Sequence, residues 1–106
     1  MAWIYLLAAG LLEIVWAYAM KQSDGFTRLT PTLVTFAALF GSLGLLALAM
    51  RSLPLGVAYM LWTGIGAVGA FAVGVIVLGE SASAGRLVAA ALIAGGLIMM
   101  KMTSPT

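Results

Sequence analysis

The 106-residue chain contains no cysteine and no histidine, and only 8% of its residues are charged. Without these two residue types the chain has no disulfides, no thiol chemistry and no zinc site built on them. A soluble domain carries about 25% charged residues, so the low charge excludes an ordinary water-soluble fold. The five Lys and Arg residues occur singly, without a basic patch or an aromatic platform, which argues against nucleic-acid binding.

Hydrophobic residues make up 64% of the chain and are gathered in long runs. A membrane-spanning helix needs about 17–25 mostly apolar residues to cross about 30 Å of hydrocarbon. The pattern therefore predicts an all-α integral membrane protein, with residues 1–106 as a single domain of four short transmembrane helices. The expected spans are residues 2–20, 31–50, 55–78 and 84–101, the last being marginal in length.

The connections between these runs contain helix-start signals. Thr30 followed by Pro31 predicts an N-cap and a first-turn proline at the start of the second span. Pro54 opens the third span in the same way, and Ser83 is the expected cap of the fourth. No connection has the composition of a linker between domains.

The charges at the helix ends give a weak orientation signal. Lys21, Arg28 and Arg86 fall on one side of the membrane, and Arg51 and Lys101 fall on the other. Either the chain has one orientation with a weak signal, or it inserts both ways up. Dual insertion would allow two copies to pair as inverted halves of an antiparallel dimer. Four helices of this length do not easily enclose a solute pathway, which also favours an oligomer.

Glu13 is the main candidate for chemistry because it lies near the middle of the first span. An ionisable group there costs about 2.5–3.5 kcal/mol on insertion scales. Protonation is the cheapest response, so such a carboxyl can bind a proton and a cation in turn. A purely structural ion pair is the alternative, but every Lys and Arg lies near a span end or between spans.

Helical spacing places Gly10, Glu13, Trp16 and Met20 on one face of the first span. Trp16 is either an interfacial anchor or a wall beside Glu13, and the spacing leaves both readings open.

Three more polar or aromatic residues are candidate neighbours of the carboxylate. Tyr59 and Trp62 are i,i+3 neighbours in the third span, where the hydroxyl can bond a carboxylate and the indole face can receive a flat cation. The alternative is lipid-facing packing. Ser42, in the middle of the second span, can donate to Glu13, although membrane serines more often bond their own backbone or let helices approach.

Residues 64–69 (Gly-Ile-Gly-Ala-Val-Gly) fit the G-x-G-x-x-G pattern but lie inside an apolar run. A dinucleotide site needs a preceding strand and a later acidic residue, so the segment instead predicts a small-residue face for close helix packing. Ala91 and Gly95 form a similar pair in the fourth span and predict a dimer contact. No nucleophile–base pair, metal cluster or phosphate loop is present in the sequence, so neither an enzyme nor a cofactor is predicted.

Together these residues resemble the small multidrug resistance transporters over essentially the whole chain. The resemblance rests on Glu13 in the first of four short spans and on Tyr59 and Trp62 in the third. Two segments are similar to the guanidinium exporter branch, which has Trp16 where the quaternary-ammonium branch has Gly. They are Glu13-Ile14-Val15-Trp16-Ala17, followed by Lys21 and Gly25-Phe26-Thr27-Arg28, and the stretch from Trp62 to Ala70.

The resemblance implies an antiparallel homodimer in the bacterial cytoplasmic (inner) membrane. It implies export of guanidinium and small substituted guanidinium cations in exchange for protons, by alternating access. Glu13 from both subunits would form the shared site for substrate and proton. The residues that would wall, orient or polarise it are Gly10, Trp16, Ser42, Tyr59 and Trp62.

Three positions depart from the family pattern: Val57 and Met60 beside Tyr59, and Tyr18 after the Trp-Ala pair. They leave the breadth of the substrate range open. Two alternative functions also remain: a quaternary-ammonium multidrug exporter of the same family, and a non-transporting membrane subunit that packs beside a larger partner.

Overall fold

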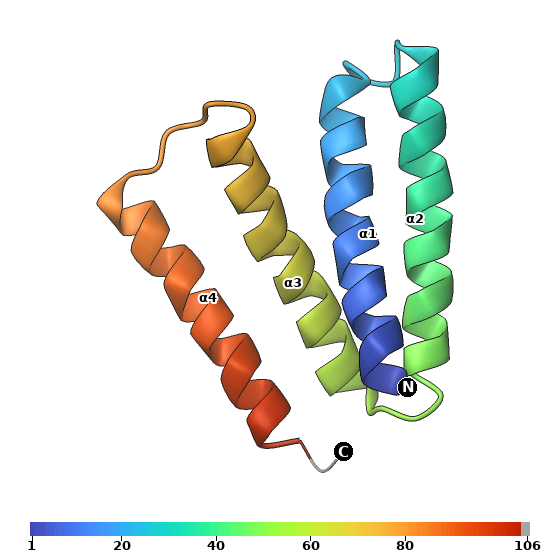
Figure 1. Ribbon diagram of the computed structural model, residues 1–106, viewed down its shortest axis with the longest axis vertical. Helices are drawn as coiled ribbons and strands as arrows, with labels where there is room; N and C mark the ends of the chain where they lie inside the picture. The colour runs from blue at the N-terminus through green and yellow to red at the C-terminus, as the bar shows by residue number, and fades with distance from the viewer. Residues whose placement is uncertain (105–106) are drawn as a thin grey trace.

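The computed structural model describes residues 1–104. It consists of four α-helices joined by short loops (Figure 1). Each helix is long and apolar enough to cross a membrane, so the predicted all-α membrane fold is confirmed. The helices are α1 (Ala2–Gln22), α2 (Leu29–Ala49), α3 (Leu55–Ile76) and α4 (Ala84–Met102).

The start of α2 differs from the prediction. The helix begins at Leu29 with Arg28 as its extended N-cap residue, so the expected cap at Thr30 is wrong. Pro31 still lies in the first turn, where a proline fits because the first N–H groups of a helix have no intrahelical acceptor. The cap of α4 is as predicted: Ser83 Oγ accepts a hydrogen bond from the backbone N–H of Arg86 at 3.3 Å.

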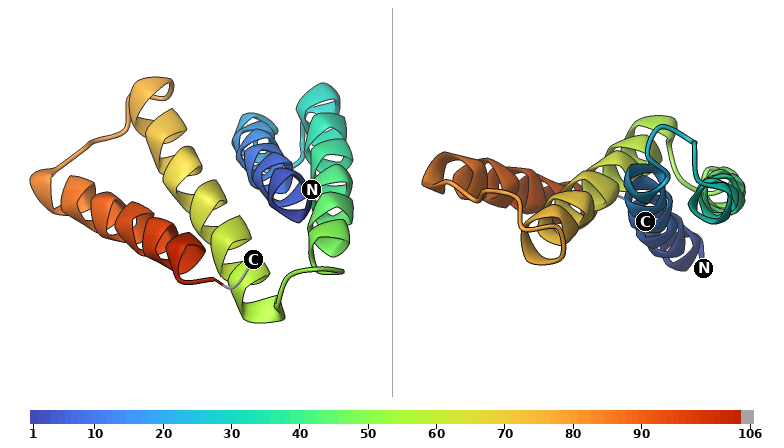
Figure 2. Two further views of the ribbon diagram at one scale, coloured as in Figure 1. Left: turned by 60° about the horizontal axis from the view of Figure 1, so that its bottom comes forward. Right: turned by 90° about the horizontal axis from the view of Figure 1, so that it is seen from above.

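The four helices form a thin layer in which α1 is central. α1 packs against both α2 and α3, whereas α4 packs mainly against α3. Figures 1 and 2 show α4 on the outer side of α3, away from α1 and α2. The layer measures 43 × 34 × 16 Å, and its smallest dimension is little more than the diameter of one helix, about 10–12 Å.

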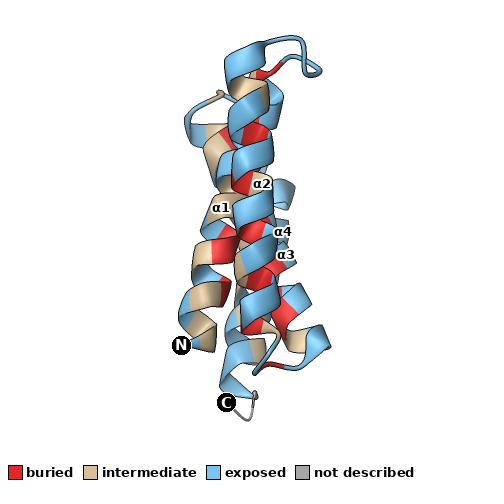
Figure 3. Cartoon of the chain, turned by 90° about the vertical axis from the view of Figure 1, so that its right-hand side faces the viewer, coloured by how far each residue is buried: buried red, intermediate tan, exposed pale blue. Residues whose placement is uncertain are grey.

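Burial follows this arrangement, as Figure 3 shows. The hydrophobic core lies where α1, α2 and α3 meet, toward the end of the layer that holds the N-terminus. α4 has no buried residue. The buried residues of the core are Leu6, Ala9, Leu46, Ala49, Leu53, Ala58, Leu61 and Trp62.

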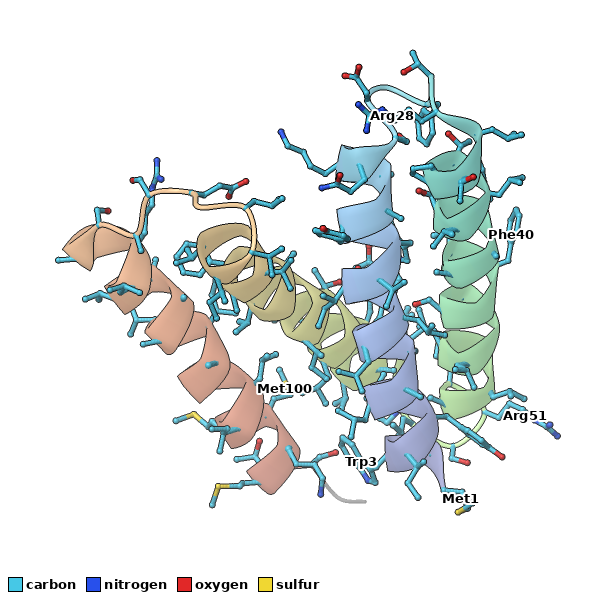
Figure 4. All side chains as sticks on the ribbon, turned by 45° about the horizontal axis from the view of Figure 1, so that its top comes forward. Met1, Trp3, Arg28, Phe40, Arg51 and Met100 are labelled. Atoms are coloured by element: carbon cyan, nitrogen blue, oxygen red, sulfur yellow. The ribbon has the colours of Figure 1, made fainter. Side chains whose placement is uncertain are left out.

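The charged residues lie at the two ends of the helices. Figure 4 shows Arg28 and Arg51 at opposite ends of the layer. Lys21 is in the last turn of α1 and Lys101 in the last turn of α4, so these two also lie at opposite ends. The middle of the layer therefore contains no positively charged residue within the part of the chain that the structure describes.

Candidate functional site

The site begins at the seam where α1 crosses α3. Glycines on each helix face large side chains on the other. A Cβ added to Gly10 would lie 2.6 Å from Cγ2 of Ile65, and one added to Gly69 would overlap Cδ1 of Ile14. The small-residue face expected on α3 therefore packs against α1, and the glycines let the two helices approach closely.

Glu13 lies in this seam and points at α3. A Cβ added to Gly66 would overlap its Oε1 and Cδ atoms. Glu13 Oε1 is buried and has no hydrogen-bond partner among residues 1–104, and the same is true of the indole Nε1 of Trp16. Leaving a buried donor or acceptor unsatisfied costs about 1–3 kcal/mol, and more for a charged group. The single chain thus leaves unpaired one acceptor on Glu13, in the seam, and one donor on Trp16, three residues further along α1.

A buried hydrogen-bond network joins α1, α2 and α3 beside this seam. Ser42 Oγ donates to the carbonyl oxygen of Ala9 at 2.6 Å and accepts from Nε1 of Trp62 at 2.9 Å. Ala9 lies one helical turn before Glu13, a rise of about 5.4 Å. Within one chain, Ser42 and Trp62 therefore bond each other and the α1 backbone, while Glu13 lies a turn away without a bond to either.

Tyr59 and Trp62 form a ring pair on α3. Their ring centroids are 5.6 Å apart and the ring planes are tilted by 42°. Trp62 is buried, but Tyr59 is 52% exposed. The aromatic pair therefore extends from the buried network to the open surface of the single chain.

The three departures from the family pattern have different surroundings. Val57 packs against the hydrophobic core, whereas Met60 is 54% exposed. Tyr18 lines an apolar cavity of about 600 Å³ between α1, α2 and α3, together with Ile14, the residue after Glu13. Among these three, Tyr18 is the one that borders a cavity reaching the neighbourhood of Glu13.

The candidate residues therefore fall into three groups. Gly10, Glu13 and Trp16 lie on α1, with Gly10 and Glu13 against α3. Ser42 and Trp62 are tied to each other, and Tyr59 lies at the open side. Sequence reasoning missed Gly66 and the Ala9 carbonyl, because a pattern within one helix carries no information on which residue of another helix it faces.

Comparison with known proteins identifies the family. A family model described as Small Multidrug Resistance protein matches residues 1–93. The chain belongs to the small multidrug resistance family. It is 55% identical over 104 residues to the guanidinium exporter of Citrobacter freundii, covering 98% of this chain and 99% of that protein. It is 54% identical to the guanidinium exporter of Yersinia pseudotuberculosis, over 98% of this chain and the full length of that protein.

The family and the four spans make this chain a multi-pass transport protein of the bacterial inner membrane. The resemblance inferred from Glu13, Trp16, Tyr59 and Trp62 is thereby confirmed at the level of the family. The roles assigned to these individual residues stay predictions.

Proposed function

We propose that this chain exports guanidinium and small substituted guanidinium cations in exchange for protons. Two relatives that match it over nearly their full length are named guanidinium exporters. The observation that carries the proposal is the Glu13 carboxylate, which lies in mid-membrane with a buried, unpartnered oxygen. In the described residues no positive charge of the chain lies at that depth, so a cation or proton from outside is the natural partner.

The chemistry of the site suits a guanidinium ion. Its planar N–H groups can form two parallel bonds to one carboxylate. Its charge is delocalised and weakly hydrated, so the ion also stacks on aromatic rings, which Trp16, Tyr59 and Trp62 can supply. A proton neutralises the same carboxylate and excludes the cation. Competition between the two ligands couples their movements in opposite directions.

The proposal includes an antiparallel homodimer that works by alternating access. A layer 16 Å thick is too thin to surround a pathway, so a second layer is needed to close the site. Tyr59 is half exposed and α4 has no buried residue, which leaves both available to a second copy. Two inverted copies would bring two Glu13 carboxylates to one site near the middle of the membrane.

The test is cation-driven proton flux in proteoliposomes. Liposomes loaded with guanidinium and an entrapped pH dye are diluted into guanidinium-free buffer. We expect guanidinium efflux to drive proton entry, so that the lumen becomes acidic. Glu13→Gln should abolish this signal, and Glu80→Gln, in the α3–α4 loop, should preserve it. Absence of guanidinium-driven acidification with the unmodified protein would refute the proposal, and a signal with a bulky quaternary ammonium ion alone would favour the multidrug alternative.

A further inference from the structure

Gly66 faces the carboxylate of Glu13 across the α1–α3 seam. The glycine is buried, and a Cβ at this position would overlap Oε1 and Cδ of Glu13 and lie 2.7 Å from its Cγ. The carboxylate thus occupies the space that any other residue at position 66 would fill with its own side chain.

We propose that Gly66 is a positioning residue for the cation site. Because it has no side chain, the Glu13 carboxylate can reach the α3 backbone, and this resting place sets where the carboxylate meets its cation or proton. The inference rests on the proposed function, since it takes Glu13 as the ligand of the transported ions. It adds a residue on another helix that controls the reach of that ligand.

The neighbouring glycines separate this role from helix packing in general. At Gly69 an added Cβ would overlap the end of the Ile14 side chain, and at Gly64 it would meet the methyl groups of Leu97. All these collisions are with side-chain ends that can rotate away, so the helices can keep their positions. A methyl group added at position 64 or 69 would displace an aliphatic side chain. A methyl group added at position 66 would displace the Glu13 carboxylate.

Alanine is also a better helix former than glycine, by about 1 kcal/mol in a helix interior. Gly66→Ala and Gly69→Ala should therefore both fold with four helices. They form a matched pair: the same substitution on the same helix, one displacing Glu13 and the other displacing Ile14.

The first experiment measures guanidinium binding to the full-length protein by titration calorimetry. We expect Gly66→Ala to raise the Kd about tenfold, the equivalent of one weakened bond to a charged group. Gly69→Ala should stay within about twofold of the unmodified protein. Equal losses in the two variants would reduce Gly66 to a packing residue and overturn the inference.

A compensating substitution tests the reach of the carboxylate directly. Aspartate is one methylene shorter than glutamate, so Glu13→Asp withdraws the carboxylate from α3 and should weaken binding by itself. In the double variant Gly66→Ala, Glu13→Asp the new methyl group occupies the space that the shorter side chain vacates. The double variant should therefore bind guanidinium with the same Kd as Glu13→Asp alone. A hinge or packing role for Gly66 gives additive losses in the double variant, which would contradict the inference.

A cation-free measurement separates this inference from the proposed function. The chain has two glutamates, Glu13 and Glu80, so carboxyl carbon NMR of glutamate-labelled protein gives one probe and one internal reference. At fixed pH, without guanidinium, the Glu13 resonance should move in Gly66→Ala and stay in place in Gly69→Ala. An unmoved resonance refutes the positioning role, even if guanidinium transport is found. A moved resonance supports it, even if the transported cation proves to be a different one.

Discussion

The indole N–H of Trp62 donates to the hydroxyl of Ser42 at 2.9 Å, and both side chains are buried. The hydroxyl of Ser42 in turn donates a hydrogen bond to the carbonyl oxygen of Ala9. One hydroxyl therefore joins three helices at a level one turn from Glu13. Its donor capacity is fully used within the single chain, so Ser42 can approach the carboxylate only if this network rearranges.

Removing the acceptor of this hydrogen bond should destabilise the protein more than removing its donor. Ser42→Ala leaves the buried Trp62 N–H without an acceptor, which costs about 1–3 kcal/mol. Trp62→Phe leaves Ser42 bonded to Ala9 and should cost less. The double variant should show a coupling energy near the roughly 0.6 kcal/mol found for hydrogen bonds between membrane helices. Thermal unfolding in detergent measures the stability of the two single variants and of the double variant. The smaller ring of phenylalanine also lowers stability, but by the same amount with or without the Ser42→Ala substitution, so this loss cancels from the coupling energy.

Guanidinium binding should weaken as the pH falls. Protonation neutralises the Glu13 carboxylate, so protons and cations compete for it. The competition predicts that the apparent Kd rises by about tenfold per pH unit for each proton displaced, once the pH is below the range in which Glu13 titrates. Calorimetry across a pH series checks this, with binding measured in buffers of different protonation enthalpy to count the protons released. A Kd that is independent of pH would exclude direct competition.

The pattern of long apolar runs was sufficient to predict the four spans, because membrane thickness determines how long a run must be. α2 begins at Leu29, two residues before Pro31. A proline fits anywhere in the first turn of a helix, so its position does not determine the first residue of the helix. The contact between Gly66 and Glu13 was not predictable, because each helix can be rotated about its axis without changing its own pattern. The candidate residues could be named from the sequence, but their pairing required the structure.

The end of α4 is linked to the start of α1 by a cation–π contact. Lys101 Nζ lies 4.4 Å from the centroid of the Trp3 ring, at the end of the layer where Figure 4 labels Trp3. Lys101→Gln should lower the free energy of unfolding by about 0.5–1 kcal/mol, the value of such a contact at an exposed site. Arg51→Gln, an exposed charge at the same end of the layer, is the control. Thermal unfolding in detergent should show a loss for Lys101→Gln beyond that of the control, and equal losses would show that the contact contributes nothing.

The first turn of α4 should depend on its cap. Ser83 Oγ accepts from the backbone N–H of Arg86 at 3.3 Å, and loss of such a cap costs about 0.5–2 kcal/mol. Ser83→Ala should therefore lower stability and raise hydrogen exchange at the start of α4. Ser52→Ala, at an exposed serine in the α2–α3 loop, should do neither. Unchanged exchange at Ala84 to Arg86 would show that the cap is dispensable.

The antiparallel dimer can be tested through α4, because the chain has no cysteine of its own. Gly85 and Met99 lie near opposite ends of this helix, about 21 Å apart at 1.5 Å per residue, too far for a disulfide within one chain. In an antiparallel pair, position 85 of one copy approaches position 99 of the other. The double variant Gly85→Cys, Met99→Cys should therefore cross-link in membranes, while each single variant should not.

Two further variants complete this experiment. Ala91 and Gly95 are exposed near the middle of α4. If position 85 of one copy faces position 99 of the other, the antiparallel pair is centred at position 92, so position 91 lies about 3 Å along the axis from its own copy and position 95 about 9 Å. Ala91→Cys should therefore cross-link as a single variant, and Gly95→Cys should not. If Gly85→Cys and Met99→Cys also cross-linked singly, position 85 would face position 85 and the pair would be parallel. Two Glu13 residues would still meet in a parallel pair, but both copies would present the same face to the same side of the membrane. The inward-open and outward-open states would then no longer be related by a two-fold axis in the membrane plane, and the antiparallel part of the proposal would have to be abandoned.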